Sequence, residues 1–445
     1  MLQLRHPEAT PLPLRLDLPA LGFGAAAIGN LYRPMSDAEA HSAVAAAIAA
    51  GIVYFDTAPH YGFGLSEARL GLALSELDPH ERTVVSTKVG RRLDPIAPDH
   101  AHGPRHGFVG AAAFEPVFDY GYDAVMRSYE ESRRRLRRDR IDILFAHDLG
   151  RATHGDAHPE HFRTFMEGGY RALRKLRDSG AVGAIGLGVN EWQVCEEALS
   201  VADFDVILLA GRYTLLEQGA LDSFLPKCAT RGVSVIVGGP YNSGILAQGV
   251  GGEGPFHYNY APAPPDVVAR VARLEAICAR YDTPLAAAAL QFPLAHPQVR
   301  SVIPGMASPS EVDEAVRLMQ VAIPDTLWTA LREDDLLHAQ CPTPRASAPA
   351  PFLLLHPDDN VVVVRAPIAA GDRLVIDGQA VTAAVSVDVG HKLARRALRP
   401  GDKVYKYGAP IGSMRIAAAR GEHVHMHNLG SDYIASHTRN AVGAA

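Results

Sequence analysis

The sequence has few cysteines, little net charge and no long apolar run, and each shortage excludes a class of protein. Its four cysteines are far apart and form no C-x-x-C pair, which argues against a disulfide framework and a thiolate zinc site. A net charge of −6 over 445 residues gives no support for nucleic-acid binding. The longest apolar stretch, residues 43–55, is shorter than the ~20 residues that span a bilayer. We therefore expect a soluble, cytoplasmic protein with no nucleic-acid or membrane partner.

Eight short apolar runs recur along the first three-quarters of the chain. Most are apolar throughout and rich in β-branched residues, which is typical of strands buried on both faces of a parallel sheet. The runs are 21–29, 53–57, 83–89, 142–148, 184–189, 205–211, 233–239 and 299–305. Segments with helical spacing lie between them, among them 37–50, 123–136, 170–179, 266–281 and 311–319. The pattern predicts an α/β fold, a (β/α)8 TIM barrel, whose chemistry lies at the carboxyl ends of the strands.

The composition changes at residues 339–351, a segment rich in proline and alanine that is typical of a linker. It separates a predicted barrel over 1–338 from a second module over 352–445. In that module short alternating runs are divided by Ala-Gly-Asp, Pro-Gly-Asp and Arg-Gly-Glu turns, which predicts a small all-β domain. The runs are 360–365, 373–376, 381–387, 403–407 and 423–427.

Four polar residues lie at the carboxyl ends of neighbouring predicted strands. Asp56 and Tyr61 belong to the second strand, Lys88 to the third and His147 to the fourth. A tyrosine has an ordinary pKa near ~10, so acid–base work at neutral pH requires a cation beside it, and Lys88 can supply that charge. Asp56 would keep Lys88 charged, and His147 would hydrogen-bond the substrate oxygen. The alternative, four unrelated polar residues at a barrel rim, requires a coincidence at successive strands.

The motifs around these residues resemble those of the aldo-keto reductase family. They are D-T-A-x-x-Y-G-x-x-x-S-E, S-T-K-V, D-I-L-x-x-H-D and V-I-P-G, which follow one another in order between residues 21 and 337. The resemblance implies that Tyr61 is the catalytic acid/base, that Asp56 and Lys88 tune it, and that His147 orients the substrate.

The resemblance also places the contacts of a nicotinamide cofactor. Asn190 falls where the family holds the carboxamide, and Tyr213 where an aromatic ring stacks on the nicotinamide. The loops after the seventh and eighth strands would bind the phosphates and the ribose. The expected contacts there are Gly239, Pro240, Asn242, Gly244 and Leu246, followed by Pro304, Gly305, Ser308 and Glu311. Glu311 stands where members that prefer NADPH carry a basic residue, so NAD is favoured, with NADP as the alternative.

Longer segments narrow the resemblance to one branch of this family. They are D-T-A-P-H-Y-G-x-G-L-S-E, F-D-Y-G-Y-D-A-V-M-R-S-Y-E-E-S, G-L-G-V-N-E-W and A-G-R-Y-T-L-L-E-Q. They resemble the branch that oxidises free aldoses at C1, to which pyridoxal 4-dehydrogenases are related. The implied reaction converts an L-fucose-like sugar into its lactone with NAD. Residues 114–122 and Arg212 are candidate contributors to the sugar pocket by loop position alone. A pyridoxal dehydrogenase, a general aldehyde reductase and a redox-sensing subunit without catalytic activity are the alternatives.

The all-β module carries the motifs L-H-P-x-D-N-V, G-H-K, K-Y-G-x-P-I-G and G-E-H-V-H-M-H-N in order. With them it resembles the small domain of altronate and galactarate dehydratases, a β-clip, SAF-like fold, over residues 352–430. The large catalytic domain of those enzymes is missing, so a separate large sugar-acid dehydratase subunit is a candidate partner. His423, His425 and His427 would point to one face of a strand. With His356 and His391 they could bind a divalent metal or a sugar acid, which would make the protein bifunctional. The alternative is that these histidines are structural.

Overall fold

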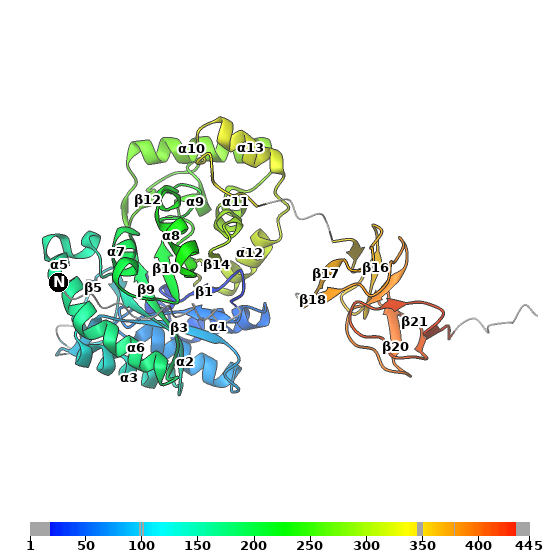
Figure 1. Ribbon diagram of the computed structural model, residues 1–445, viewed down its shortest axis with the longest axis horizontal. Coiled ribbons are helices and arrows are strands. Elements are labelled where there is room, and N and C mark those ends of the chain that lie inside the picture. Colours follow the sequence, from blue (N-terminus) through cyan, green and yellow to red (C-terminus); the bar gives the residue numbers. More distant parts are fainter. Residues whose placement is uncertain (1–17, 98, 100–101, 345–349, 378, 433–445) are drawn as a thin grey trace, which may run out of the picture. The chain divides into compact units, whose positions relative to one another are not determined.

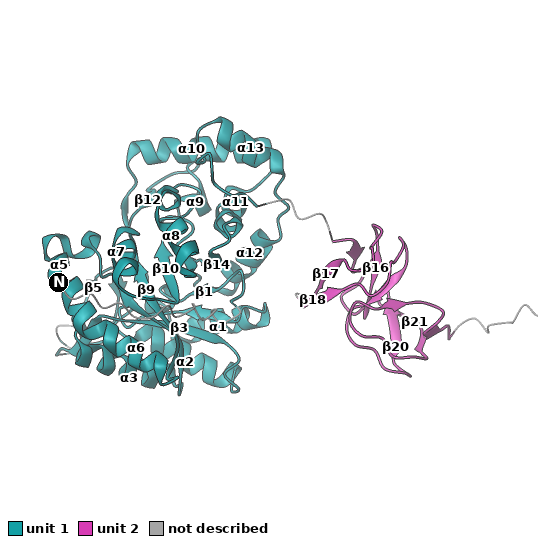
Figure 2. Cartoon of the chain, viewed as in Figure 1, with its two compact units in different colours: residues 1–345 teal, residues 346–445 magenta. Residues whose placement is uncertain are grey.

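The computed structural model describes residues 18–97, 99, 102–344, 350–377 and 379–432. The chain divides into two compact units, residues 1–345 and residues 346–445 (Figure 2). Each unit has hydrophobic clusters of its own.

The first unit is a (β/α)8 barrel, as the alternation of strands and helices predicts (Figure 1). Neighbouring strands are parallel throughout, and parallel bridges between Leu21 and Val302 and between Gly24 and Gly305 join the last strand to the first. In spatial order the strands are β1 (Phe23–Gly24), β2 (Tyr54–Asp56), β3 (Val84–Val89), β8 (Ile141–His147), β9 (Val182–Val189), β10 (Val206–Ala210), β11 (Ser234–Gly238) and β14 (Val299–Ile303).

Helices surround the barrel and supply its outer core (Figure 1). The segments predicted from helical spacing form helices with ends shifted by one or two residues. The main helices are α1 (Asp37–Ala49), α2 (Leu65–Leu77), α3 (Tyr122–Leu136), α6 (Tyr170–Asp178), α7 (Gln193–Val201), α8 (Phe224–Arg231), α10 (Pro265–Arg280), α11 (Leu285–Gln291), α12 (Pro309–Met319) and α13 (Asp325–Glu333).

A separate cluster of apolar side chains fills the inside of the barrel. Tyr54, Ile143, Phe145, Val206 and Ile236 belong to it, and all five are fully buried. The strands therefore face apolar surroundings on both sides, which explains why their sequences are apolar throughout rather than alternating. The packed interior leaves the carboxyl ends of the strands as the place where a ligand can enter.

Short antiparallel pairs occupy the loops that follow β3 and β11. After β3, β4 (Arg91–Pro95) pairs with β7 (Phe114–Phe118), and β5 (Pro104–Arg105) pairs with β6 (Phe108–Val109). After β11, β12 (His257–Tyr258) pairs with β13 (Ala261–Pro262). These loops carry side chains to the mouth of the barrel.

The second unit is all-β, as predicted. Its strands pair in antiparallel fashion. They are β15 (Phe352–Leu353), β16 (Val361–Val364), β17 (Arg373–Ile376), β18 (Gln379–Thr382), β19 (Lys392–Ala394), β20 (Lys403–Lys406), β21 (Ala409–Met414), β22 (His423–Val424) and β23 (Leu429–Gly430). Two expectations need correction: the strand predicted over 381–387 covers Gln379–Thr382, and the one over 423–427 ends at Val424.

The three Gly-Asp and Gly-Glu turns of this unit are built alike. In each, a carboxylate accepts a hydrogen bond of 2.8 Å from the backbone N–H three residues before it, and the acceptors are Asp372, Asp402 and Glu422. The glycine before each carboxylate has a positive φ of 80° to 92°, where a side chain would be strained. The recurring tripeptides are therefore turn signals with one shared physical cause.

Within the described residues, no helix is long and apolar enough to cross a membrane.

Candidate active site

Three of the four predicted catalytic residues form one hydrogen-bonded group, in which Asp56 and Lys88 are buried and Tyr61 is half-buried. The Nζ of Lys88 lies 2.7 Å from Oδ2 of Asp56, 2.8 Å from the carbonyl oxygen of Thr57 and 3.2 Å from Oη of Tyr61. Asp56 also accepts a bond of 2.6 Å from the hydroxyl of Ser86. A buried ion pair is tolerated only when hydrogen bonds satisfy its remaining donors and acceptors, and this pair meets that condition.

The charges of this group affect the pKa of Tyr61. Burial raises the pKa of Tyr61, and the ammonium of Lys88 opposes that rise. For Lys88 itself, burial would lower the pKa, but the ion pair with Asp56 outweighs it and the pKa is raised. Lys88 is therefore charged at neutral pH and stabilises the anionic form of the tyrosine.

His147, the last residue of β8, faces the tyrosine across the mouth of the barrel. The ring centroids of Tyr61 and His147 are 6.0 Å apart. Burial, followed by the charges of Arg91 and Lys88, lowers the pKa of His147 well below its ordinary value. The imidazole is therefore neutral at physiological pH. The backbone carbonyl oxygen of His147 accepts a hydrogen bond of 2.8 Å from the hydroxyl of Tyr120, which fixes the backbone at the strand end.

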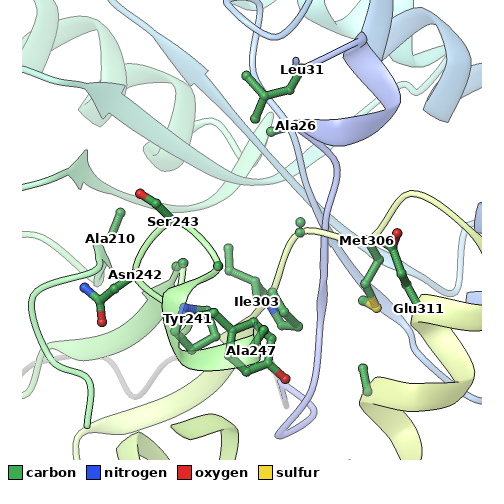
Figure 3. Close-up of a pocket in the computed structure, with 18 of the residues that line it drawn as sticks. Ala26, Leu31, Ala210, Tyr241, Asn242, Ser243, Ala247, Ile303, Met306 and Glu311 are labelled. Carbon is green, nitrogen blue, oxygen red and sulfur yellow. The ribbon is translucent and has the colours of Figure 1, made fainter. Parts of the chain in front are cut away.

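A cavity of about 670 Å³ is lined by Asp56 and Tyr61 and by the loops after β11 and β14. Figure 3 shows Tyr241 and Asn242 of the first loop and Met306 and Glu311 of the second at this cavity. The loop after β11 is rich in glycine, and the loop after β14 contributes Gly305. Of the predicted cofactor contacts, Gly239, Pro240, Asn242, Gly244, Pro304, Gly305 and Glu311 line it.

This cavity fits a dinucleotide. A Cβ built on Gly305 would meet open space, and Gly239 has a positive φ of 53°. Backbone without side chains allows the close approach that phosphates require. A nicotinamide dinucleotide would be held between these two loops, with its inner end beside Tyr61.

Four predicted contacts do not line this cavity: Asn190, Tyr213, Leu246 and Ser308. Two of them, Tyr213 and Leu246, are buried inside the protein. Tyr213 is fully buried, packs against Phe292 with ring centroids 5.5 Å apart, and has its hydroxyl 3.7 Å from Sγ of Cys341. Leu246 is also fully buried and belongs to the outer core. Both residues follow strand ends in sequence, but their side chains turn toward the helical layer, which the sequence pattern does not reveal.

Ser308 and Glu311 have structural roles at the start of α12. The hydroxyl of Ser308 accepts a bond of 3.3 Å from the N–H of Glu311, and Oε2 of Glu311 accepts one of 2.8 Å from the N–H of Ala307. Ser308 is thus a helix cap rather than a wall of the cavity. Glu311 lines the cavity while capping, so its negative charge stays at the cavity wall.

The amide groups of the two predicted asparagines are already engaged within the protein. Asn242 donates to the carbonyl of Gly211 at 3.0 Å and accepts from the hydroxyl of Thr214 at 2.6 Å. Asn190 donates to Oδ1 of Asp148 at 3.1 Å. Asn242 therefore supports the loop that contributes to the cavity, and the position of the Asn190 amide depends on Asp148.

A second cavity, of about 460 Å³, meets the first at Tyr61 and is lined by His147 and Asn190. Sequence reasoning missed several of its wall residues, which come from other loops. They are Tyr32, His60, Arg91, His106, Phe108, Asp148 and Tyr260. His60 and Asp148 stand inside quoted motifs next to catalytic residues, which was a usable signal. Phe108 and Tyr260 lie in irregular loops whose folding only tertiary structure shows.

The candidate pocket residues chosen by loop position lie outside this cavity. Arg212 donates to the carbonyl of Asn190 at 2.7 Å and lines a neighbouring groove. In segment 114–122, Phe118 packs under the guanidinium of Arg91, 4.6 Å from its ring centroid. This segment therefore supports a wall residue instead of providing one.

Four of the five predicted histidines of the second unit come together. The ring centroid of His391 lies 4.9 Å from those of both His423 and His425, and His427 lies 5.4 Å from His423. Nδ1 of His391 is 2.9 Å from Nε2 of His423. His356 lies outside this group, with its Nδ1 3.7 Å from Oδ2 of Asp358. The prediction that His423, His425 and His427 lie on one face of a strand is wrong, because the strand ends at Val424.

The cause is Asn428, whose side chain accepts from the N–H of His425 and donates to the carbonyl of His423, at 2.9 Å each. These bonds form a turn directly after β22. Among the residues that the structure describes, no group of three or more His, Cys, Asp or Glu side chains has the geometry of a metal site. The set of five predicted metal ligands therefore does not form.

The fold and the site define a class: a (β/α)8-barrel enzyme with a tyrosine beside a buried lysine at the mouth of a dinucleotide-sized cavity. The model of the aldo/keto reductase family matches residues 20–335. The chain belongs to the aldo/keto reductase family, a family of oxidoreductases that use NAD or NADP. The model of the altronate/galactarate dehydratase SAF domain matches residues 350–432.

Individual relatives agree with this membership. The chain is 45% identical over 332 residues to pyridoxal 4-dehydrogenase of Microbacterium luteolum, covering 72% of this chain and 95% of that protein. It is 40% identical over 331 residues to D-threo-aldose 1-dehydrogenase of a Pseudomonas species, covering 74% and 96%. Altronate dehydratase of Escherichia coli matches 77 residues at 42% identity, which are 17% of this chain and 16% of that enzyme.

A solved structure of a glycerol dehydrogenase from Gluconobacter oxydans has the same fold. It superposes with a TM-score of 0.56 at 23% sequence identity, over 74% of this chain and 94% of that one.

The neutral state of His147 leads to a prediction about pH. Because its pKa lies well below 6.5, it should not titrate between pH 6 and 8. We therefore expect the pH profiles of kcat/KM for the wild type and His147→Gln to have the same shape between pH 6 and 8. The variant should have a kcat/KM roughly 10²-fold lower at each pH, because a positioned hydrogen bond is lost. Steady-state profiles of both proteins measure this. A wild-type limb near pH 6.5 that vanishes in the variant would contradict it.

Proposed function

We propose that the barrel is an NAD-dependent aldose 1-dehydrogenase, which oxidises the anomeric carbon of an L-fucose-like sugar to a lactone. The observation that carries the proposal is the tyrosine hydroxyl held 3.2 Å from a buried ammonium, where the two cavities meet. The polar wall of the smaller cavity suits a substrate with several hydroxyl groups. The relative that oxidises D-threo-aldoses supports the same substrate class.

The residues of the site would act in defined roles. Tyr61 acts in its phenolate form, after its own proton has left to solvent, and the ammonium of Lys88 stabilises this anion. The phenolate Oη then accepts the proton of the anomeric hydroxyl. Asp56 keeps Lys88 charged and in place. The neutral imidazole of His147 holds the reacting oxygen by a hydrogen bond. A bound nicotinamide would supply the acceptor for the C1 hydride, and the sugar, having lost this hydride and the hydroxyl proton, would become a 1,5-lactone.

The preference for NAD is part of the proposal and depends on charge. Glu311 and Glu314 both line the outer part of the larger cavity. A 2′-phosphate at this wall would meet two carboxylates, whereas a 2′-hydroxyl could donate to one of them. NADP is the alternative cofactor.

A second candidate function is oxidation of pyridoxal, or general aldehyde reduction. The observation that favours it is the identity of 45% to a pyridoxal 4-dehydrogenase. Aromatic side chains also line the substrate cavity, among them Phe108 and Tyr260, and they could stack on a pyridine ring.

For the second unit we propose a link to sugar-acid dehydration. The match to the SAF domain of altronate and galactarate dehydratases supports this, since the lactone formed by the barrel yields a sugar acid on hydrolysis. The clustered imidazoles of His391, His423, His425 and His427 are the candidate contacts for the acid's carboxylate. A separate large dehydratase subunit is the partner that we propose.

The substrate assignment is tested by following NAD reduction with L-fucose, L-galactose, D-arabinose and pyridoxal. We expect turnover with at least one sugar and a higher kcat/KM for it than for pyridoxal. Tyr61→Phe should lower kcat by at least about 10²-fold because the proton acceptor is removed. If no sugar is oxidised, the aldose proposal is wrong, and turnover of pyridoxal alone would establish the second candidate.

The cofactor preference is tested by comparing kcat/KM for NAD and NADP. We expect NAD to be preferred, and Glu311→Gln to raise the ratio of NADP to NAD efficiency about fivefold to tenfold, because one charge is lost while the amide oxygen still accepts from Ala307. Asp313→Asn, an exposed change on the same helix, is the matched control and should leave the ratio unchanged. Wild-type preference for NADP would refute the proposal.

The role of the second unit is tested with the double variant His391→Ala/His423→Ala in the full chain. Calorimetry with an aldonate, such as L-fuconate, should show binding to the wild type and a loss of at least about tenfold in the variant. His356→Ala is the control, since His356 lies outside the cluster, and aldose oxidation should be unchanged in both. Absence of aldonate binding to the wild type would contradict the proposal.

A further inference from the structure

Arg91, the first residue of β4, brings a guanidinium to the substrate cavity beside the catalytic group. Its side chain is only 15% exposed. Nη2 donates to Oδ2 of Asp148, and Nη1 lies 3.2 Å from Nε2 of His60. The ring of Phe118 supports the guanidinium from one side, 4.6 Å away. The group is therefore held rigidly by an anion, an imidazole and an aromatic face.

Asp148 is the residue on which this arrangement depends. It adopts a positive φ of 50° directly after β8, a conformation that aspartate tolerates better than most residues. Oδ1 accepts from the amide of Asn190 at 3.1 Å, while Oδ2 binds Arg91 and lies 3.4 Å from Nε2 of His147. The buried carboxylate of Asp148 thus binds the guanidinium of Arg91 and the amide of Asn190, and it lies beside the imidazole of His147.

The guanidinium has more donors than the protein uses. Arginine carries five N–H groups, and among the residues that the structure describes its partners are Asp148 and His60. Nε is buried without a partner, and Arg91 is among the residues that line the cavity. Leu31 and Phe108 line the same cavity with apolar side chains. A ligand that enters therefore meets both a guanidinium and apolar surface.

We infer that Arg91 is a specificity-determining residue that binds a substrate hydroxyl on a carbon beyond the reacting C1, and that Asp148 is its positioning residue. This inference depends on the proposed aldose oxidation and deepens it. A hydroxyl oxygen can accept from Nη1, whereas an aldehyde without further hydroxyls leaves that donor unpaired in a cavity from which the substrate has displaced water. A site built to hydrogen-bond a hydroxyl discriminates strongly against analogues that lack it.

The competing explanation is that Arg91 only neutralises the buried charge of Asp148. In that case its loss would disturb His147 and Asn190 for every substrate alike. The two explanations therefore differ in whether the effect of a substitution depends on the hydroxyl groups of the substrate.

The test compares Arg91→Lys with the wild type, using an aldose that the wild type oxidises, the set of its monodeoxy analogues, and propanal in the reductive direction. Lysine keeps the positive charge beside Asp148 but not the fork of donors. We expect kcat/KM for the aldose to fall about 10- to 100-fold. We expect kcat/KM for propanal and KM for the cofactor to stay within about threefold.

The deoxy analogues show which hydroxyl is bound. For the wild type, removal of one particular hydroxyl should cost at least about tenfold in kcat/KM, and the same removal should cost nothing in Arg91→Lys. Arg92→Met is the matched control, because Arg92 lies on the same strand but binds Asp94 and Asp119. It should leave every ratio unchanged.

Other results would overturn the inference. Equal losses for aldose and propanal, or an undiminished deoxy penalty in Arg91→Lys, would show that Arg91 acts only through Asp148. If Arg91→Lys does not fold, the wild-type deoxy series still decides, since no single hydroxyl with a tenfold effect means no such contact. A wild type that oxidises no aldose overturns the proposed function as well, so the two failures are distinguishable.

Discussion

The active site depends on the buried ion pair between Asp56 and Lys88. Burying two charges is unfavourable unless each finds further partners, and here the hydroxyl of Ser86 and the carbonyl of Thr57 supply them. The two charged residues lie on β2 and β3, so the pair also fixes the carboxyl ends of adjacent strands relative to each other. The carboxylate raises the pKa of Lys88, so the ammonium stays charged and can stabilise the anionic form of Tyr61.

A second ion pair joins Arg91 to Asp148, the residue after His147 in the chain, and all three line the same cavity. Burial and the charges of Arg91 and Lys88 together keep the pKa of the imidazole low. The two pairs therefore place two cations at the mouth of the barrel. One pair places an ammonium 3.2 Å from the tyrosine hydroxyl, and the other places a guanidinium at the smaller cavity, which His147 also lines.

The second unit depends on its turns more than on a large hydrophobic core. Its strands are short and its two apolar clusters are small, so much of its structure depends on turns. The repeated carboxylate caps supply backbone hydrogen bonds at those turns, and the side chain of Asn428 does the same after β22. That last turn brings the histidines together, which shows how a turn can gather side chains that an extended strand would have spaced apart.

The sequence by itself determined the barrel, the strand ends and the residues of the catalytic group, because apolar runs of strand length and polar residues directly after them are local signals. Pro304, Gly305 and the glycine-rich loop, which the sequence indicated as cofactor contacts, line the larger cavity. Tertiary structure decided where side chains beyond the strand ends point: Tyr213 and Leu246 turn into the core, and Ser308 caps a helix. It also decided which distant loops meet, as when β4 brings Arg91 to Asp148. The physical reason is that strand periodicity is local, whereas a loop's course and a buried charge's partner are set by packing between segments far apart in the chain.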